Sequence, residues 1–90
     1  MEKQTFIEAL TAEGFQSIAE VARKADEFVD VHVHPFEAKA LILDGEISLR
    51  LGEAERRYGI GQVFHLNPQE AHSERCGPAG VTYLVGRKTS

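Results

Sequence analysis

The stretch ALILDGEISLRL, residues 40–51, decides the fold class. Its first half is a continuous apolar run, and Asp44-Gly45 separates it from the second half. In that second half apolar and polar side chains alternate with a period of two, which places the apolar ones on one face of a β-strand. Asp-Gly between two apolar runs is a strong hairpin signal, because both turn residues adopt positive φ. The stretch therefore predicts two antiparallel strands, 38–43 and 46–51, joined by a turn.

The same kind of pattern recurs along the rest of the chain. From Phe15 onward, short segments rich in Ile, Val, Leu and Phe alternate with turn residues. Repeated short strands at such spacing are typical of a sandwich or a barrel. We expect strands at 16–23, 28–34, 38–43, 46–51, 54–58, 62–66, 71–76 and 80–86.

A helix is expected ahead of these strands, over residues 5–13. Thr5 and Glu8 have the spacing of a capping box, and Gly14 supplies a stop. A purely structural role is sufficient for this helix, which would cover an open end or edge of the sheet. The predicted organisation is an N-terminal helix within residues 1–14, followed by a single all-β domain over residues 15–90.

Length and composition restrict the class of protein. The chain has 90 residues, which suits one small domain, and it is 42% hydrophobic and 27% charged, as in ordinary globular proteins. The formal net charge is −4, and the ten Lys and Arg residues are scattered along the chain. A scattered basic complement does not form a phosphate-binding surface, so no nucleic-acid partner is expected.

Cysteine content and hydropathy indicate the compartment. Cys76 is the only cysteine, so no disulfide can form within the chain, as expected in a reducing compartment. The first residues are charged and lack the apolar core of a signal peptide, and no apolar run approaches membrane-spanning length. We therefore expect a cytoplasmic protein that does not bind membranes. A domain this small has a thin core, which favours a homodimer.

The four histidines are the residues that suggest chemistry. His32 and His34 are two positions apart on a predicted strand, so they share a face with Cα atoms roughly 6–7 Å apart. Two imidazoles at this spacing can converge on one metal ion, and His72 is the natural third ligand. Taken alone, the spacing equally fits two histidines on a solvated strand face.

The wider context favours the metal site, because the chain resembles the cupin superfamily. The segment HVHPFEAKALILDG, residues 32–45, matches the first cupin motif in His32, His34 and the closing Gly45. The segment GQVFHLNPQEAH, residues 61–72, matches the second motif in its opening Gly61 and in His72. The two motifs and their short spacer cover about half of the chain.

The resemblance implies a fold and a cofactor. The implied fold is a small RmlC-like jelly roll, or double-stranded β-helix, with a divalent metal ion such as Fe, Mn, Ni or Zn in the barrel. The implied ligands are His32, His34 and His72, a set similar to the three-histidine site of thiol dioxygenases in the same superfamily. The implied role is to act on or to sense a small molecule, with dioxygenase-like chemistry as one option. The alternative is a non-catalytic ligand-binding or structural barrel with a degenerate site.

Several positions depart from the family's motifs. Asp26 and Gln69 stand where the motifs have glycine, Asn67 where the second has proline, and Cys76 where it has asparagine. Ala38 occupies the position of the family's glutamate ligand, and Glu37 precedes it. A shift of one residue turns a strand side chain to the opposite face, so Glu37 becomes a fourth ligand only if the chain bulges after Pro35.

No residue is assigned as a general acid or base. Glu37, Glu74 and Tyr83 are candidates by residue type alone. Cys76 is expected to be a buried small hydrophobe, with a pocket-lining thiol as the alternative. Glu74, Cys76 and Tyr83 are the candidate pocket-lining residues, and His65 is expected to be a structural or an interface residue.

Overall fold

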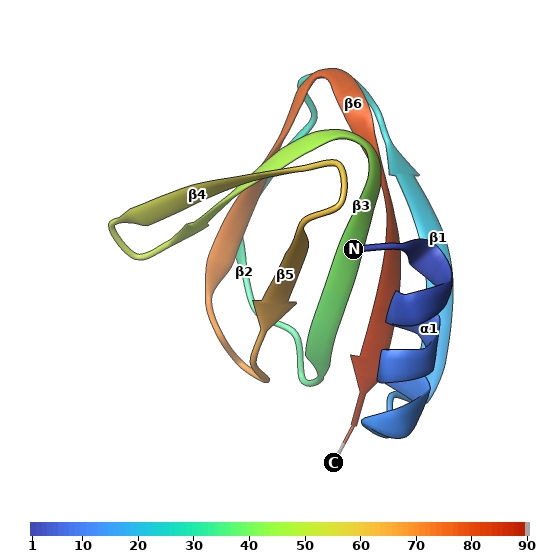
Figure 1. The fold of residues 1–90 in the computed structure, drawn as a ribbon. Helices are drawn as coiled ribbons and strands as arrows, with labels where there is room; N and C mark the ends of the chain where they lie inside the picture. The colour runs from blue at the N-terminus through green and yellow to red at the C-terminus, as the bar shows by residue number, and fades with distance from the viewer. Residues whose placement is uncertain (90) are drawn as a thin grey trace.

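The computed structural model describes residues 1–89 and consists of one helix followed by six strands. Strands β3 and β6 are the long ones, and the rest of the fold is arranged around them (Figure 1). The elements are α1 (Lys3–Ala12), β1 (Ser17–Arg23), β2 (Phe28–His32), β3 (Glu37–Leu51), β4 (Ala54–Gly59), β5 (Val63–Leu66) and β6 (His72–Lys88).

All six strands form one antiparallel sheet in which β3 and β6 are central neighbours. The first half of β6 pairs with β2 and its second half with β1. The first half of β3 pairs with β5 and its second half with β4. Each long strand therefore serves two shorter partners, and the sheet curves around an enclosed inner face (Figure 1).

The expected turn at Asp44-Gly45 is wrong, because β3 runs through it as one strand. Gly45 has a φ of 73°, and the register against β6 shifts on both sides of it, so the strand bends at a bulge. Residues 77–79, which separate the expected strands 71–76 and 80–86, also lie within β6, opposite this bend. The β3–β4 hairpin instead turns at Gly52, whose φ is 62°.

Two glycines make this double bend sterically feasible. A Cβ atom added to Gly45 would lie 2.1 Å from the carbonyl oxygen of Gly80. A Cβ atom added to Gly80 would lie 2.5 Å from the carbonyl oxygen of Arg23. Backbones from β1, β3 and β6 therefore meet here without room for a side chain, which Gly alone permits.

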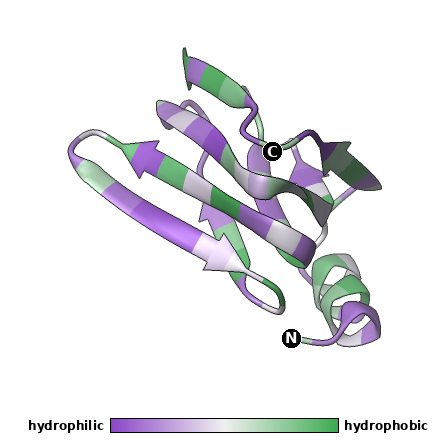
Figure 2. Ribbon diagram, turned by 90° about the horizontal axis from the view of Figure 1, so that it is seen from above, coloured by the Kyte–Doolittle hydropathy of each residue, from purple (hydrophilic) through white to green (hydrophobic). Residues whose placement is uncertain are grey.

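The core has two parts, one on each face of the sheet. The inner face carries alternate side chains of the long strands, including Ile42, Ile47 and Tyr83, together with Phe64 of β5. On the opposite face, Phe6 and Leu10 of α1 pack on the apolar side chains of the sheet. The helix lies beside strands that carry alternating hydrophilic and hydrophobic bands (Figure 2).

The start of α1 differs from the sequence expectation. The helix begins at Lys3, and Glu2 is its N-cap without a side-chain hydrogen bond, so the capping box at Thr5 and Glu8 does not form. The end is as expected: Gly14 has a φ of 86°, and the next amide, of Phe15, donates to the carbonyl of Leu10. Within residues 1–89 no helix is long and apolar enough to cross a membrane.

Candidate metal centre

Strands β2 and β6 bring His32 and His72 face to face, since the two residues are direct partners in the antiparallel register. The centroids of their rings are 4.2 Å apart. His34 follows β2, and its ring centroid lies 4.8 Å from that of His32 and 5.3 Å from that of His72. The three histidines that the sequence proposes as ligands therefore converge.

Hydrogen bonds fix the orientation of two of the rings. His32 Nδ1 lies 2.7 Å from the carbonyl oxygen of Asp30, and His72 Nδ1 lies 2.9 Å from that of Glu70. A carbonyl oxygen only accepts, so Nδ1 carries the proton in each ring and Nε2 of the neutral imidazole has a free lone pair. A hydrogen bond from Nδ1–H to a backbone carbonyl is typical of metal-ligating histidines.

The lone pairs of both rings are directed toward one carboxylate. Glu74 Oε2 lies 3.2 Å from His32 Nε2 and 3.2 Å from His72 Nε2. No hydrogen bond joins these atoms, and the buried His72 Nε2 has no hydrogen-bond partner among the described residues. Three acceptor atoms that face one another at this distance need a cation or a proton between them.

A divalent ion fits this donor set. The four ligand atoms from His32, His34, His72 and Glu74 all lie within 4.8 Å of one another. Metal–nitrogen and metal–oxygen bonds are about 2.0–2.2 Å, so two ligands of one ion are at most about 4.4 Å apart. Small side-chain rotations close the remaining difference. Imidazole and carboxylate together suit first-row divalent metals.

Burial also favours the metal-binding form of His34. Its pKa is lowered below the ordinary histidine value, chiefly by burial and further by the neighbouring His32 and His72. A lowered pKa keeps the imidazole neutral at neutral pH, which is the form that ligates a metal. On its other side, the His34 ring stacks on Phe36 at 4.8 Å with an interplanar angle of 20°.

The carboxylate that faces the three histidines belongs to Glu74 and not to Glu37. No register shift separates Glu37 from Ile42, so β3 alternates regularly from its start. Ala38 therefore points inward, and Glu37 points outward to His65, with its Oε2 2.6 Å from the ring Nε2. The hydrogen bond from His65 lowers the pKa of Glu37. The bulge after Pro35 that would bring Glu37 inward is absent from the described chain.

The sequence predicts Glu74 as a pocket-lining residue and not as a metal ligand. Its position two residues after His72 is the signal that could have placed it beside the metal, because both side chains then share a strand face. The same spacing relates His32 to His34. The cluster is thus two pairs of alternate residues, one on β6 and one at the end of β2, where His32 is the last strand residue and His34 follows it.

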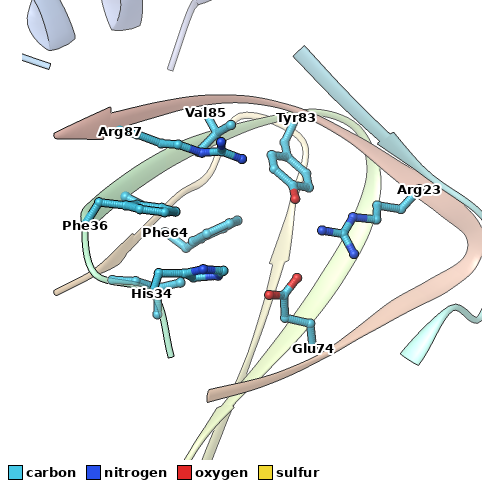
Figure 3. A pocket seen from close by; sticks show the side chains of 10 residues that line it. Arg23, His34, Phe36, Phe64, Glu74, Tyr83, Val85 and Arg87 are labelled. Carbon is cyan, nitrogen blue, oxygen red and sulfur yellow. The ribbon is translucent and has the colours of Figure 1, made fainter. Parts of the chain in front are cut away.

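A cavity of about 70 Å³ opens on this cluster. His34 and Glu74 form one end of it, and Phe36, Phe64 and Ala38 form apolar walls. Tyr83, Arg23 and Arg87 also reach into it, and Figure 3 shows the Tyr83 hydroxyl and the Arg23 guanidinium directed toward the Glu74 carboxylate. Burial raises the pKa of Tyr83, which keeps the phenol protonated at neutral pH.

The remaining sequence candidate, Cys76, does not line this cavity. It is a free cysteine packed in the inner core, where only 4% of its surface is exposed. Burial raises the pKa of its thiol. Cys76 therefore behaves as the small hydrophobe expected from the sequence.

No protein-family model and no curated protein matches this sequence. Solved structures match it in fold. The cupin domain of Schizosaccharomyces pombe Cnp3 superposes with a TM-score of 0.76 at 19% identity, over 87% of this chain and 58% of that one. An RmlC-like cupin from Shewanella frigidimarina gives a TM-score of 0.70 at 16% identity, over 81% of this chain and 65% of that one.

This chain therefore has the cupin fold. The DMSP lyase DddQ from Ruegeria pomeroyi also matches, with a TM-score of 0.71 at 27% identity over 82% of this chain and 39% of the lyase. The chain thus spans less than two thirds of the length of each of these three structures.

At two departures from the cupin motifs the residue is not glycine, but its backbone conformation is one typical of glycine. Asp26 has a φ of 58° and Gln69 a φ of 61°, and within residues 1–89 they are the only non-glycine residues with positive φ. Both stand where the cupin motifs have glycine, the residue that adopts a positive φ most readily. The Gln69 amide donates to the carbonyl of His34, so this strained residue helps to hold a ligand segment.

Proposed function

We propose that this small cupin binds one divalent metal ion through His32, His34, His72 and Glu74, and that it acts on a small molecule held in the adjoining cavity. The observation that carries the proposal is the pair of free Nε2 lone pairs, on His32 and His72, that face one Glu74 oxygen at 3.2 Å. The fold and the cluster of three histidines and one glutamate support the same conclusion.

The chain's own residues give such a site its character. A bound divalent ion would supply Lewis acidity, or dioxygenase-like chemistry if it is iron. Glu74 would offset part of the ion's charge, and Arg23 and Tyr83 would orient that carboxylate from the cavity side. The aromatic walls of Phe36 and Phe64 would exclude water from the space beside the ligands.

A non-catalytic ligand-binding or sensing barrel is the second candidate. Apart from the arginines and the metal ligands, Tyr83 is the one titratable residue among those that line the cavity. Since burial raises the pKa of Tyr83, its phenol is a poor general base at neutral pH. A cavity with no free base is better suited to holding a ligand than to proton abstraction.

The deciding measurement is the metal content of protein purified without a chelator or a metal-binding tag. We expect about one equivalent of a first-row divalent metal in the wild type and a loss of it in His72→Ala. His65→Ala is the matched control, because His65 bonds Glu37 outside the cluster. The proposal would be refuted if the wild type is purified without metal and takes up no Zn, Fe, Mn or Ni on titration. Equal metal content in His72→Ala and His65→Ala would also refute it.

Oxygen uptake then separates the two candidates. Iron-loaded protein is incubated with a panel of small thiols, diketones and carboxylic acids, and uptake above that of His72→Ala indicates an oxygenase. Binding of a panel member without turnover, under air or under nitrogen, supports the sensing barrel.

We also propose a cytoplasmic homodimer. Ile18, Phe28, Val31 and Val33, on β1 and around β2, are large apolar residues that stay exposed in the isolated chain. A second copy that covers them would bury apolar surface that this thin core leaves in water. Light scattering coupled to size exclusion tests this, with a mass near 20 kDa expected from the 10.0 kDa chain.

A further inference from the structure

The two arginines of the cavity differ in how their charges are balanced. Arg23 lies 3.2 Å from the Glu27 carboxylate and also faces Glu74. Arg87 has no carboxylate within salt-bridge distance among residues 1–89, and its guanidinium lies 5.1 Å from the centroid of the Phe36 ring. The cavity therefore contains one cation whose charge the described protein does not neutralise.

Strand alternation places Arg87 on the inner face. Tyr83, Val85 and Arg87 are two residues apart along β6, and all three line the cavity. Figure 3 shows the Phe36 ring between Arg87 and His34, so the guanidinium and the metal ligands lie at opposite sides of the aromatic wall. Arg87 is exposed, which leaves its N–H groups accessible from solvent.

We infer that the cavity takes a short carboxylic acid, whose carboxylate pairs with Arg87 while its hydrocarbon end lies against the apolar walls. This inference does not rest on the proposed metal site, because Arg87 and these walls are outside the cluster of candidate ligands. A planar guanidinium binds a carboxylate with two parallel hydrogen bonds. Phe36, Phe64 and Val85 then contact the apolar end of the acid.

The size of the cavity limits the acid to a few carbon atoms. Its volume of about 70 Å³ gives room for roughly five to seven water-sized groups, at ~10–15 Å³ of cavity volume for each. Propionate and butyrate are therefore expected to fit, whereas octanoate is too long. The apolar walls also favour a carboxylate over inorganic phosphate, whose oxygens would face Phe36 and Phe64 without hydrogen-bond donors.

The experiment is an NMR titration of zinc-loaded protein with propionate, butyrate, octanoate, phosphate and the neutral isostere propionamide. We expect propionate or butyrate to shift the Arg87 Nε–H signal and to bind about 10–100-fold more weakly to Arg87→Met, the range for loss of a charge-assisted hydrogen-bonded contact. Arg87→Lys keeps the positive charge but not the planar guanidinium, so its affinity for the acid should fall between those of the wild type and Arg87→Met.

Arg56→Met is the matched control. Its guanidinium also lies over an aromatic ring, 5.3 Å from the centroid of Tyr58, but outside the cavity. Equal binding of butyrate by Arg87→Met and the wild type overturns the inference, as does equal binding of propionamide and propionate, or no acid binding at all. Preference for phosphate overturns the carboxylate assignment.

The zinc content of the wild type shows separately whether the proposed metal site fails. If the wild type holds no zinc, the same titration is run on metal-free protein, because Arg87 does not depend on the ion. If the acid binds the metal-free wild type and Arg87→Met weakens that binding, the inference holds and only the proposed function fails. If no acid binds, both are overturned. Thermal unfolding confirms that each variant is folded.

Discussion

His32 on β2 lies opposite His72 on β6, and the Oε2 atom of Glu74 lies 3.2 Å from the Nε2 atom of each. The two histidines are held alike, since each Nδ1–H bonds a carbonyl two residues earlier in the chain. This symmetry aims two lone pairs at one carboxylate. The arrangement is unfavourable by itself and becomes favourable once a cation lies between the three atoms.

Glu74→Gln should change stability in opposite directions with and without metal. In the metal-free protein the new amide can donate to an Nε2 lone pair, so the free energy of unfolding rises by about 0.5–1.5 kcal/mol. With zinc present, loss of the ligand charge weakens metal affinity, so much of the stabilisation by the metal disappears. Denaturant unfolding in EDTA and in zinc measures both, with the exposed Glu53→Gln as control. A change of the same sign in both conditions would contradict the lone-pair argument.

Gln69→Gly should stabilise the protein. A non-glycine residue with left-handed φ costs about 1–2 kcal/mol, and glycine gives back part of this through its freer unfolded chain. The φ of 61° at Gln69 thus predicts a net gain of about 0.5–1 kcal/mol in the free energy of unfolding. Glu8→Gly in α1 should instead lose about 1 kcal/mol. A stability loss in Gln69→Gly would mean that its side chain makes a compensating contact.

Gly45→Ala should be strongly destabilising because the new Cβ would lie 2.1 Å from the carbonyl oxygen of Gly80. Overpacking and left-handed strain together predict a loss of about 3 kcal/mol. Gly52→Ala is the control, since it has a similar φ of 62° but no atom within 4 Å of the added Cβ. Its loss should stay near 1 kcal/mol. Equal losses would show that β3 and β6 can separate at the bend.

The Glu37–His65 pair should make stability depend on pH in the acid range. The hydrogen bond from His65 lowers the pKa of Glu37 in the folded chain below its ordinary value of 4.5. Below that value the unfolded chain therefore binds more protons, so the stabilisation is complete above pH 4.5 and is lost as the pH falls through the folded pKa. Glu37→Gln should flatten this part of the curve of unfolding free energy against pH, and Glu53→Gln should leave it unchanged. A curve that Glu37→Gln does not alter would assign the acid sensitivity to other carboxyls.

Cys76 should be unreactive until the protein unfolds. Its thiol is buried in the inner core, and burial raises its pKa, so little nucleophilic thiolate is present. Titration with a disulfide reagent at pH 8 should give no fast reaction in native protein and one equivalent in denaturant. Fast labelling of native protein would place the thiol on an accessible surface.

The all-β architecture and the three histidines could be predicted from residue patterns alone. Period-two alternation identifies strands because neighbouring side chains must face opposite sides of a sheet, and His32 and His34 share a face for the same reason. The strand boundaries were less accurate. Asp44-Gly45 has the chemistry of a hairpin turn, but a positive φ serves a bulge as well as a turn, and sequence does not distinguish them.

The carboxylate could not be assigned from the sequence, because the choice depended on whether β3 bulges after Pro35. The regular start of β3 turns Glu37 outward to His65 and leaves Ala38 at the cavity. Glu74 shares a strand face with His72, and the pairing of β6 with β2 then brings it to His32, which is distant in sequence.

The sequence by itself determined the strand character of the chain, the helix stop at Gly14 and the shared faces of alternate residues, because these follow from local geometry. Only the tertiary structure decided that β2 pairs with β6, that Glu74 joins His32 in the candidate metal cluster, and that Arg87 lines the cavity with no carboxylate of residues 1–89 in salt-bridge distance. These features depend on register between strands far apart in the chain, where one residue of slip reverses every side chain.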